Sequence, residues 1–352
     1  MDLSMVGNLT DPAILFFFVG LLVGAVRSNL EIPAPVAKFL SLYLLMAIGF
    51  KGGQALGQTG VTDAAVRVVA IGVVLALAIP ALGFVVLRRR IDHFDAAAIA
   101  ATYGSVSAVT FIAGTQFLTA RGDAPGGYLT VALVLMESPA IIMAVLLATW
   151  ARARRHVTEQ ATVLAGVHGP PQPPTASGVT AGHPVPTPPM SMRAILHEAF
   201  TDGAHLVLIG SLVVGAASGP TGGRAMAPFV DGVFTGLLAF FLLEMGLLVA
   251  RQLREARDVG PFLVGFAIGM PLVGATLALA LGTVAGLSVG DLALLAVLAA
   301  SGSYIVVPAV VRYAIPEARP SRYFTMALAV TFPFNIVIGI PLYHAAARAL
   351  VG

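Results

Sequence analysis

Hydrophobic stretches follow one another along nearly the whole chain, and charged, Gly or Pro residues bound each of them. A membrane-spanning helix needs about 20 mainly apolar residues, so each stretch predicts one span. The predicted spans, about ten, are residues 12–28, 33–51, 66–88, 95–118, 128–150, 204–219, 229–250, 260–286, 290–312 and 323–349. The pattern therefore predicts an all-α polytopic membrane protein.

One long polar segment interrupts this pattern. Residues 152–198 contain Gly169-Pro-Pro-Gln-Pro-Pro174 and Pro184-Val-Pro-Thr-Pro-Pro189. Such proline content favours an extended linker over a packed element. The predicted organisation is a first five-helix repeat at 1–151, a Pro-rich linker at 152–198 and a second five-helix repeat at 199–352.

The two halves resemble each other in sequence. Tyr128-Leu-Thr-Val-Ala-Leu133 matches Tyr323-Phe-Thr-Met-Ala-Leu328 at Tyr, Thr, Ala and Leu, and Tyr43–Gly49 is similar to Phe240–Gly246. Chance similarity between Ala/Leu-rich helices is the alternative, but four agreements in order favour a repeat. Because each half has an odd number of spans, the second half is inverted, which predicts a 5+5 inverted repeat.

Composition and charge fit a membrane protein. Hydrophobic residues make up 58% of the chain and charged residues 11%, against about 25% charged in soluble domains. The sequence pI of about 9.4 would suit nucleic acid, but the basic residues lie at the ends of hydrophobic stretches. There is no cysteine, which excludes disulfides, thiolate metal sites and cysteine nucleophiles. The first residues lack a basic region, so no cleavable signal peptide is expected.

The basic residues also predict the orientation. With the N-terminus outside, fifteen basic residues lie at inner ends and five at outer ends, which is a positive-inside bias that places the linker in the cytoplasm. The outer five are Lys51, Arg67, Arg121, Arg224 and Arg348.

Two predicted spans are interrupted by small polar residues. Gly104, Ser105 and Ser107 interrupt one, and Ser301-Gly302-Ser303 interrupts its counterpart in the second half. Backbone freed from helical pairing at membrane depth is tolerated where it lines a cavity. The amides that begin each new half-helix suit a small anion, and hydroxyl and carbonyl oxygens suit Na⁺. Close helix packing is the alternative for one Gly-Ser pair, but symmetric placement favours a binding site.

Two acids lie well inside apolar spans. Glu137, followed by Ser138 and Pro139, is a candidate cation ligand, and the alternatives are a protonated or a structural carboxyl. Glu244 lies nearer the cytoplasmic end, where Arg251 or Arg254 could pair with it.

For the other polar residues in the spans, a structural role is the favoured interpretation. Thr102 and Thr110 flank the first break, although a helical threonine more often bonds to its own turn. Lys51 is interpreted as an interfacial anchor rather than an anion attractor, and His205 and His344 as structural.

Several motifs together resemble the sodium-dependent bicarbonate transporters of cyanobacteria and other bacteria. They are Leu42–Gly53, Tyr103–Phe111, Met136–Ile141, Leu243–Gly246, Ser303–Pro308 and Thr331–Asn335. The resemblance covers both halves. It implies ten helices in core and gate domains, elevator-type movement, a homotrimer, Na⁺-coupled bicarbonate uptake across the bacterial plasma (inner) membrane, and a PII-like regulatory protein on the cytoplasmic face.

The resemblance also implies the ligands. The bicarbonate site it implies consists of Gly104, Ser105, Val106, Ser107, Gly302, Ser303 and Tyr304. The Na⁺ site it implies consists of Thr102, Thr110, Glu137, Ser301 and Asn335. Gly302 stands where the family pattern has Ala, and the Pro-rich linker also departs from that pattern.

Other functions are weighed against this one. A symporter of another small carboxylate should favour Arg or Lys in its site, and neither residue type lies near either break. A passive anion channel also uses broken helices, and Na⁺ dependence of uptake separates the two. An intramembrane serine enzyme would need a His or Lys base beside a break. Neither break has one, so no catalytic residue and no cofactor are expected.

Overall fold

The computed structural model describes residues 12–164, 201, 203–255, 259–304 and 306–352 of the 352-residue chain. Within these ranges the chain is helical and contains no strand. The α-helices in chain order are α2 (Pro12–Ala25), α3 (Ala34–Thr59), α4 (Asp63–Leu87), α5 (His93–Gly104), α6 (Ala108–Ala120), α7 (Leu129–Leu164), α9 (Gly203–Ala227), α10 (Phe234–Glu255), α11 (Pro261–Val284), α12 (Val289–Ala299), α13 (Val306–Ala314), α14 (Pro320–Thr325), α15 (Phe332–Phe334) and α16 (Ile340–Val351). Three π-helical turns join them, η1 (Pro228–Gly232), η2 (Met326–Thr331) and η3 (Asn335–Gly339).

Each of the ten predicted segments coincides with helix in the described residues. Seven helical stretches there are long and apolar enough to cross a membrane: Ala34–Thr59, Asp63–Leu87, His93–Ala120, Leu129–Arg154, Gly203–Arg254, Pro261–Val284 and Pro320–Val351. Two more apolar helices, Pro12–Ala25 and Val289–Ala299, are shorter. The count differs from ten because Gly203–Arg254 contains two predicted spans in one stretch, and because α2 and α12 are short. The protein is a multi-pass membrane protein.

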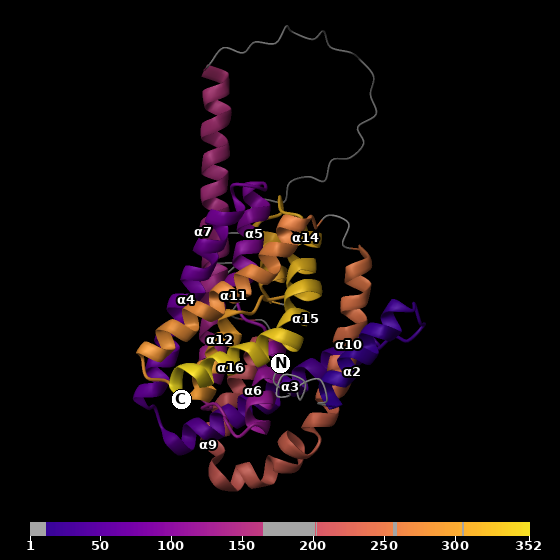
Figure 1. Cartoon of the computed structure of the whole chain (residues 1–352), viewed down its shortest axis with the longest axis vertical. Helices are drawn as coiled ribbons and strands as arrows, with labels where there is room; N and C mark the ends of the chain where they lie inside the picture. Colours follow the sequence, from indigo (N-terminus) through magenta and orange to yellow (C-terminus); the bar gives the residue numbers. More distant parts are fainter. Residues whose placement is uncertain (1–11, 165–200, 202, 256–258, 305) are drawn as a thin grey trace.

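Four helices form one group, in which α2 packs along α10 and α9 packs along α3. Figure 1 shows α2 and α10 side by side at one edge of the molecule, with α9 and α3 at one end. α10 also touches α3, which joins the two pairs. The remaining helices form a second, larger group around the interrupted helices.

Glycines let the paired helices approach closely. A Cβ added at Gly53 of α3 would lie 2.0 Å from the carbonyl oxygen of Leu212 on α9. A Cβ added at Gly20 of α2 would lie 2.0 Å from the carbonyl oxygen of Leu243 on α10. Small residues at helix contacts are the usual means of packing in membranes, because lipid offers no hydrophobic drive for association.

Helices α4 and α11 pack against the interrupted helices and support them. α4 packs on α5, α11 packs on α12, and each supporting helix carries an internal proline, Pro80 or Pro271. A Cβ added at Gly104 would lie 2.6 Å from the Pro80 ring. A Cβ added at Gly274 of α11 would lie 2.1 Å from the carbonyl oxygen of Ala299, where α12 ends. The ends of both first half-helices are thus fixed by close packing.

The last helical stretch is perturbed but not broken. Two π-helical turns, η2 and η3, flank the Phe332-Pro-Phe334 turn, and the chain stays helical from Pro320 to Val351. Single π turns inside helices are frequent at functional sites. Asn335, which follows Pro333 by two residues, therefore lies inside a continuous helical stretch.

Candidate functional site

The first break forms between two short half-helices. α5 ends at Gly104, the next three residues are non-helical, and α6 starts at Ala108. Ser107 is the N-cap of α6, because its Oγ accepts a hydrogen bond from Thr110 N at 3.2 Å. Serine is a preferred N-cap because its oxygen satisfies an amide that the helix leaves unpaired. The Thr110 hydroxyl also bonds to Ser107 Oγ, at 3.0 Å.

The second break has the same construction and contacts the first. α12 ends at Ala299, α13 starts at Val306, and Ser303 Oγ accepts a hydrogen bond from Val307 N at 3.3 Å. The backbone N–H of Ser303 donates to the carbonyl oxygen of Thr102 at 2.9 Å. This bond joins the end of α5 to the second break. The structure therefore brings the two breaks together, as their symmetric placement predicts.

A cavity of about 60 Å³ lies beside the junction of the breaks. Its lining includes Val106 and Ser107 from the first break, Ser303 and Tyr304 from the second, and Glu137 and His205. Helices α3, α9 and α10 close the opposite wall. A buried water needs about 10–15 Å³ on this measure, so the cavity has room for a few water molecules or one small polyatomic anion.

Two buried hydroxyls at the breaks have no hydrogen-bond partner in the described part of the chain, those of Ser105 and Tyr304. Ser105 is only 1% exposed. The Tyr304 hydroxyl lies near that of Ser107, but the two do not have the geometry of a hydrogen bond. Buried polar groups are nearly always paired, so an unpaired one calls for an explanation. A bound polar ligand at the breaks would supply these partners.

Glu137 faces the cavity and makes an ion-pair contact across it. Its Oε2 lies 3.0 Å from Nε2 of His205, and both side chains are buried. Glu137 belongs to α7 and His205 to α9, so this contact joins the two groups of helices. The sequence interpretation of His205 as a structural residue near a span end missed this position. The two residues are far apart along the chain, and no local pattern predicts their contact.

The other predicted Na⁺ ligands lie outside the cavity lining. Thr102 Oγ1 donates to Ala98 O at 2.9 Å, and Ser301 Oγ donates to Val297 O at 2.7 Å. Asn335 Nδ2 donates to Ala300 O at 2.8 Å, and its Oδ1 accepts from Tyr343 OH at 3.0 Å. These residues pack around the breaks, whereas Glu137 lies on the cavity side.

Among the described residues no three His, Cys, Asp or Glu side chains gather as a metal site would require. A Na⁺ shell of hydroxyl and carbonyl oxygens needs no such cluster.

Two residues weighed from the sequence fall outside the site. Lys51 lies 2.5 Å from Asp231 and over the ring of Phe234, which fits its interpretation as an anchor. Glu244 is half-buried on α10 and forms no ion pair in the described ranges. Arg251 instead pairs with Glu31, and Arg254 donates to Gly24 O.

A comparison with protein families identifies the chain. The family model of the Na⁺-dependent bicarbonate transporter superfamily matches residues 12–348, which covers both groups of helices and both breaks. The chain belongs to the Na⁺-dependent bicarbonate transporter superfamily. No curated protein matches its sequence.

Membership of this superfamily implies that the chain is a secondary transporter. The superfamily's name joins two solutes, Na⁺ and bicarbonate, and the site offers two kinds of group for them. The donors at the breaks suit an anion, and the Glu137 carboxylate suits a cation.

Proposed function

We propose that the chain imports bicarbonate together with Na⁺, with the anion bound where the two broken helices meet. The observation that carries this proposal is the junction itself, a small cavity beside two breaks that hold buried, unpaired hydroxyls. Neither Lys nor Arg is among the described residues that line this cavity. The donors there are neutral, so they suit a monovalent anion whose charge a nearby cation balances.

The anion site is Gly104–Ser107 with Gly302–Tyr304. The first helical hydrogen bond of α6 runs from Phe111 N to Ser107 O, and Thr110 N is capped by Ser107 Oγ. The amides of Ala108 and Val109 therefore remain to bind an anion at the positive end of the helix dipole. The start of α13 offers the same arrangement. Ser105 and Tyr304 would donate their hydroxyl protons to the anion's oxygens.

The proposed Na⁺ ligands are oxygens of Thr102, Thr110, Glu137, Ser301 and Asn335. A hydroxyl that donates its proton to a carbonyl keeps lone pairs that a cation can use. The internal hydrogen bonds of Thr102 and Ser301 therefore orient their oxygens without occupying them. A cation close to the breaks would favour anion binding, and the anion would favour the cation. This mutual dependence is the basis of symport.

Equivalent contacts in the two halves support the inverted repeat. Asp95, in the first turn of α5, accepts from Arg319 N and from Arg322 Nη1, both at 2.8 Å. Asp291, in the first turn of α12, accepts from Gly126 N at 2.8 Å and from Tyr128 OH at 2.6 Å. Each acid holds the loop that follows the second half-helix of the other broken helix. An inverted repeat would place these loops at opposite faces of the membrane.

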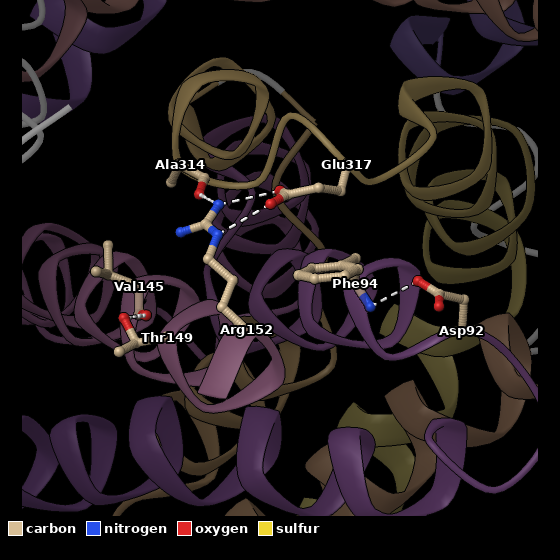
Figure 2. Close-up of polar contacts among 7 residues, drawn as sticks. All are labelled: Asp92, Phe94, Val145, Thr149, Arg152, Ala314 and Glu317. Carbon is tan, nitrogen blue, oxygen red and sulfur yellow. Dashed lines mark hydrogen bonds and ion pairs between the residues drawn. The ribbon is translucent and has the colours of Figure 1, made fainter. Parts of the chain in front are cut away.

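A second pair of contacts follows the same rule. Arg152 of α7 binds Glu317 through two bonds of 2.9 and 3.0 Å, as Figure 2 shows, and also donates to Ala314 O. Arg348 of α16 binds Asp123 at 2.7 Å. In each half, the loop after the broken helix thus binds an arginine near the end of a fifth span. A chance likeness between Ala-rich helices does not explain four matching polar contacts.

The wider architecture belongs to the same proposal. The group α2, α3, α9 and α10 would be the gate, and the larger group would be the core that carries the site past it in an elevator motion. The homotrimer, the bacterial inner membrane and the outside N-terminus come from the resemblance and the charge bias. The Pro-rich linker that would face a PII-like regulator lies largely outside the described residues.

A second candidate cargo is another small carboxylate. His205 favours it, because it places a basic side chain in the cavity lining where the sequence predicts none. A passive anion channel is the third candidate function. Uptake of labelled bicarbonate into proteoliposomes, with formate, acetate or pyruvate as competitors, separates the cargoes. Competition by a carboxylate stronger than that by unlabelled bicarbonate would contradict the proposal.

A further inference from the structure

A second cavity lies next to the proposed site. It has a volume of about 360 Å³ and lies between α13 and α14. Its lining includes Tyr304, Arg312, Tyr313, Tyr323 and Phe324. Tyr304 lines both this cavity and the smaller one at the breaks. We name the larger cavity the α13–α14 cleft. Among the described lining residues, Tyr304 is the one that the two cavities share.

The charge of the cleft is positive and uncompensated. Arg312, in the last turn of α13, is exposed and has no acidic partner among the described residues. The acids nearby are already bound, because Glu317 pairs with Arg152 and Asp95 pairs with Arg322. Figure 2 shows the first of these pairs, with Arg152 also bound to the end of α13 at Ala314. The described residues that line the cleft include no carboxylate.

The size and lining of the cleft favour a hydrated anion. A water molecule in the liquid occupies about 30 Å³, so the cleft holds on the order of ten waters. Its other lining groups include Ser321 and tyrosines, whose hydroxyls can donate hydrogen bonds. A wet cleft with one unpaired guanidinium binds anions weakly and quickly, as a vestibule should.

We propose that the α13–α14 cleft is an anion vestibule on the cytoplasmic side, with Arg312 as its binding residue and Tyr304 as the partition from the site. That the anion is bicarbonate rests on the proposed function. The vestibule would take a small hydrated monovalent anion released past Tyr304 and hold it near Arg312 before it reaches the cytosol.

The absence of native cysteine makes this proposal directly testable. Ser321, exposed and in the cleft lining, is replaced in Ser321→Cys, and the thiol is labelled from the cytoplasmic side with anionic and cationic methanethiosulfonates. Once each rate is divided by that of the same reagent with a free thiol in solution, the anionic reagent should react about fivefold faster, as expected for one close cation. Adding Arg312→Gln should remove this preference. The matched control is Arg89→Gln, which removes an exposed arginine outside the cleft lining and should preserve it.

Protection from labelling by bicarbonate is the second part of the test. Bicarbonate should slow labelling of Cys at 321 in the chain that has Arg312 and not in Arg312→Gln. Equal rates for the two reagents, or a preference that survives Arg312→Gln, would overturn the vestibule. Should Ser321→Cys fail to fold, Tyr313→Cys, also in the cleft lining and 51% exposed, gives the same comparison.

Transport separates the two proposals. Labelling that depends on Arg312, in a chain without Na⁺-dependent bicarbonate uptake, supports the vestibule and contradicts the proposed function. Na⁺-dependent uptake without an Arg312-dependent preference supports the function and contradicts the vestibule.

Discussion

Ser105 and Ser303 use their hydroxyls in different ways, although both lie at a break. Ser105 Oγ is buried without a partner in the described residues, whereas Ser303 Oγ accepts from Val307 N at the start of α13. The first hydroxyl therefore lacks a hydrogen bond that a ligand at the break would supply, although Ser105 itself does not line the cavity. The second also holds the half-helix whose amides would face the anion.

We expect Ser105→Ala to raise the KM for bicarbonate about tenfold or more, because a hydrogen bond to a charged group contributes about 1.5–3 kcal/mol. The unfolding temperature should hardly change. Ser303→Ala should weaken uptake too, with some loss of stability. Thr115→Ala is the control, since that hydroxyl bonds to Phe111 O of its own helix. Normal bicarbonate kinetics in both serine variants would remove these residues from the site.

We expect opposite effects on the Na⁺ dependence of uptake from substitutions of the two intramembrane acids. Glu137 lines the cavity and contacts His205, whereas Glu244 is outside the lining. Glu137→Gln should raise the Na⁺ concentration for half-maximal uptake at least several-fold, because it removes the carboxylate charge in the cavity wall. Glu244→Gln should leave that concentration unchanged. Na⁺ titrations of uptake that show the reverse pattern would move the cation site to α10.

The glycines of the two breaks also differ. A Cβ at Gly104 would lie 2.6 Å from the Pro80 ring, whereas a Cβ at Gly302 would make an ordinary contact of 3.4 Å with Ala327. Gly104→Ala should destabilise the protein by about 1–3 kcal/mol, the usual cost of overpacking. Gly302→Ala should be as stable as the wild type. Thermal unfolding in detergent compares the two variants, and equal stabilities would contradict the packing described for Gly104.

At the residue scale, the sequence identifies the residues that form the breaks better than it predicts which side chains contact each other. The pattern of Gly and Ser indicated both breaks, and the rule that helical threonines bond to their own turn holds for Thr102, whose hydroxyl donates to Ala98 O. The contact of Glu137 with His205 could not be predicted, because it depends on how α9 packs against α7. A lone histidine near a span end carries no signal of that packing.

At the scale of the element, the positions of the helix ends differ most from the spans predicted from the sequence. The predicted span 128–150 continues as α7 to Leu164, because hydropathy marks where a helix leaves the membrane and not where its hydrogen bonds stop. The predicted span 204–219 ends where Gly219 adopts a φ of 59° before Pro220, and helix resumes as far as Ala227. Glycine tolerates this left-handed conformation, so the kink follows from residue type.

The loop after α6 carries a pH-dependent contact. The hydrogen bond from His344, reinforced by Arg348, lowers the pKa of Asp123 below its ordinary value of 3.8. A lowered carboxyl pKa stabilises the folded state above the ordinary value, and this contribution is lost as pH falls through the lowered value. The stability advantage of the wild type over Asp123→Asn should thus be constant near neutral pH and shrink below about pH 4. Unfolding temperatures measured across that range test this, and an advantage that grows with acid would contradict it.

At the scale of the whole molecule, the main prediction from the sequence is the repeat. Weak matches such as Tyr128–Leu133 with Tyr323–Leu328 predict two related halves, and Asp95 and Asp291 make matching contacts from each half to the other. The pairing of α2 with α10 and of α9 with α3 exchanges helices between halves. Periodicity along one helix does not predict that exchange, because the glycines that permit it, such as Gly53 and Gly20, also suit other partners.

The central claim concerns the whole molecule, because symport requires both solutes to act on one site. The most direct test is uptake of labelled inorganic carbon into proteoliposomes, at a pH where bicarbonate dominates, with and without an inward Na⁺ gradient. The account predicts uptake that requires Na⁺ and accumulates bicarbonate above its outside concentration. Bicarbonate uptake that is equal in the presence and absence of Na⁺, and that stops at equilibrium, would indicate a passive channel and contradict the account.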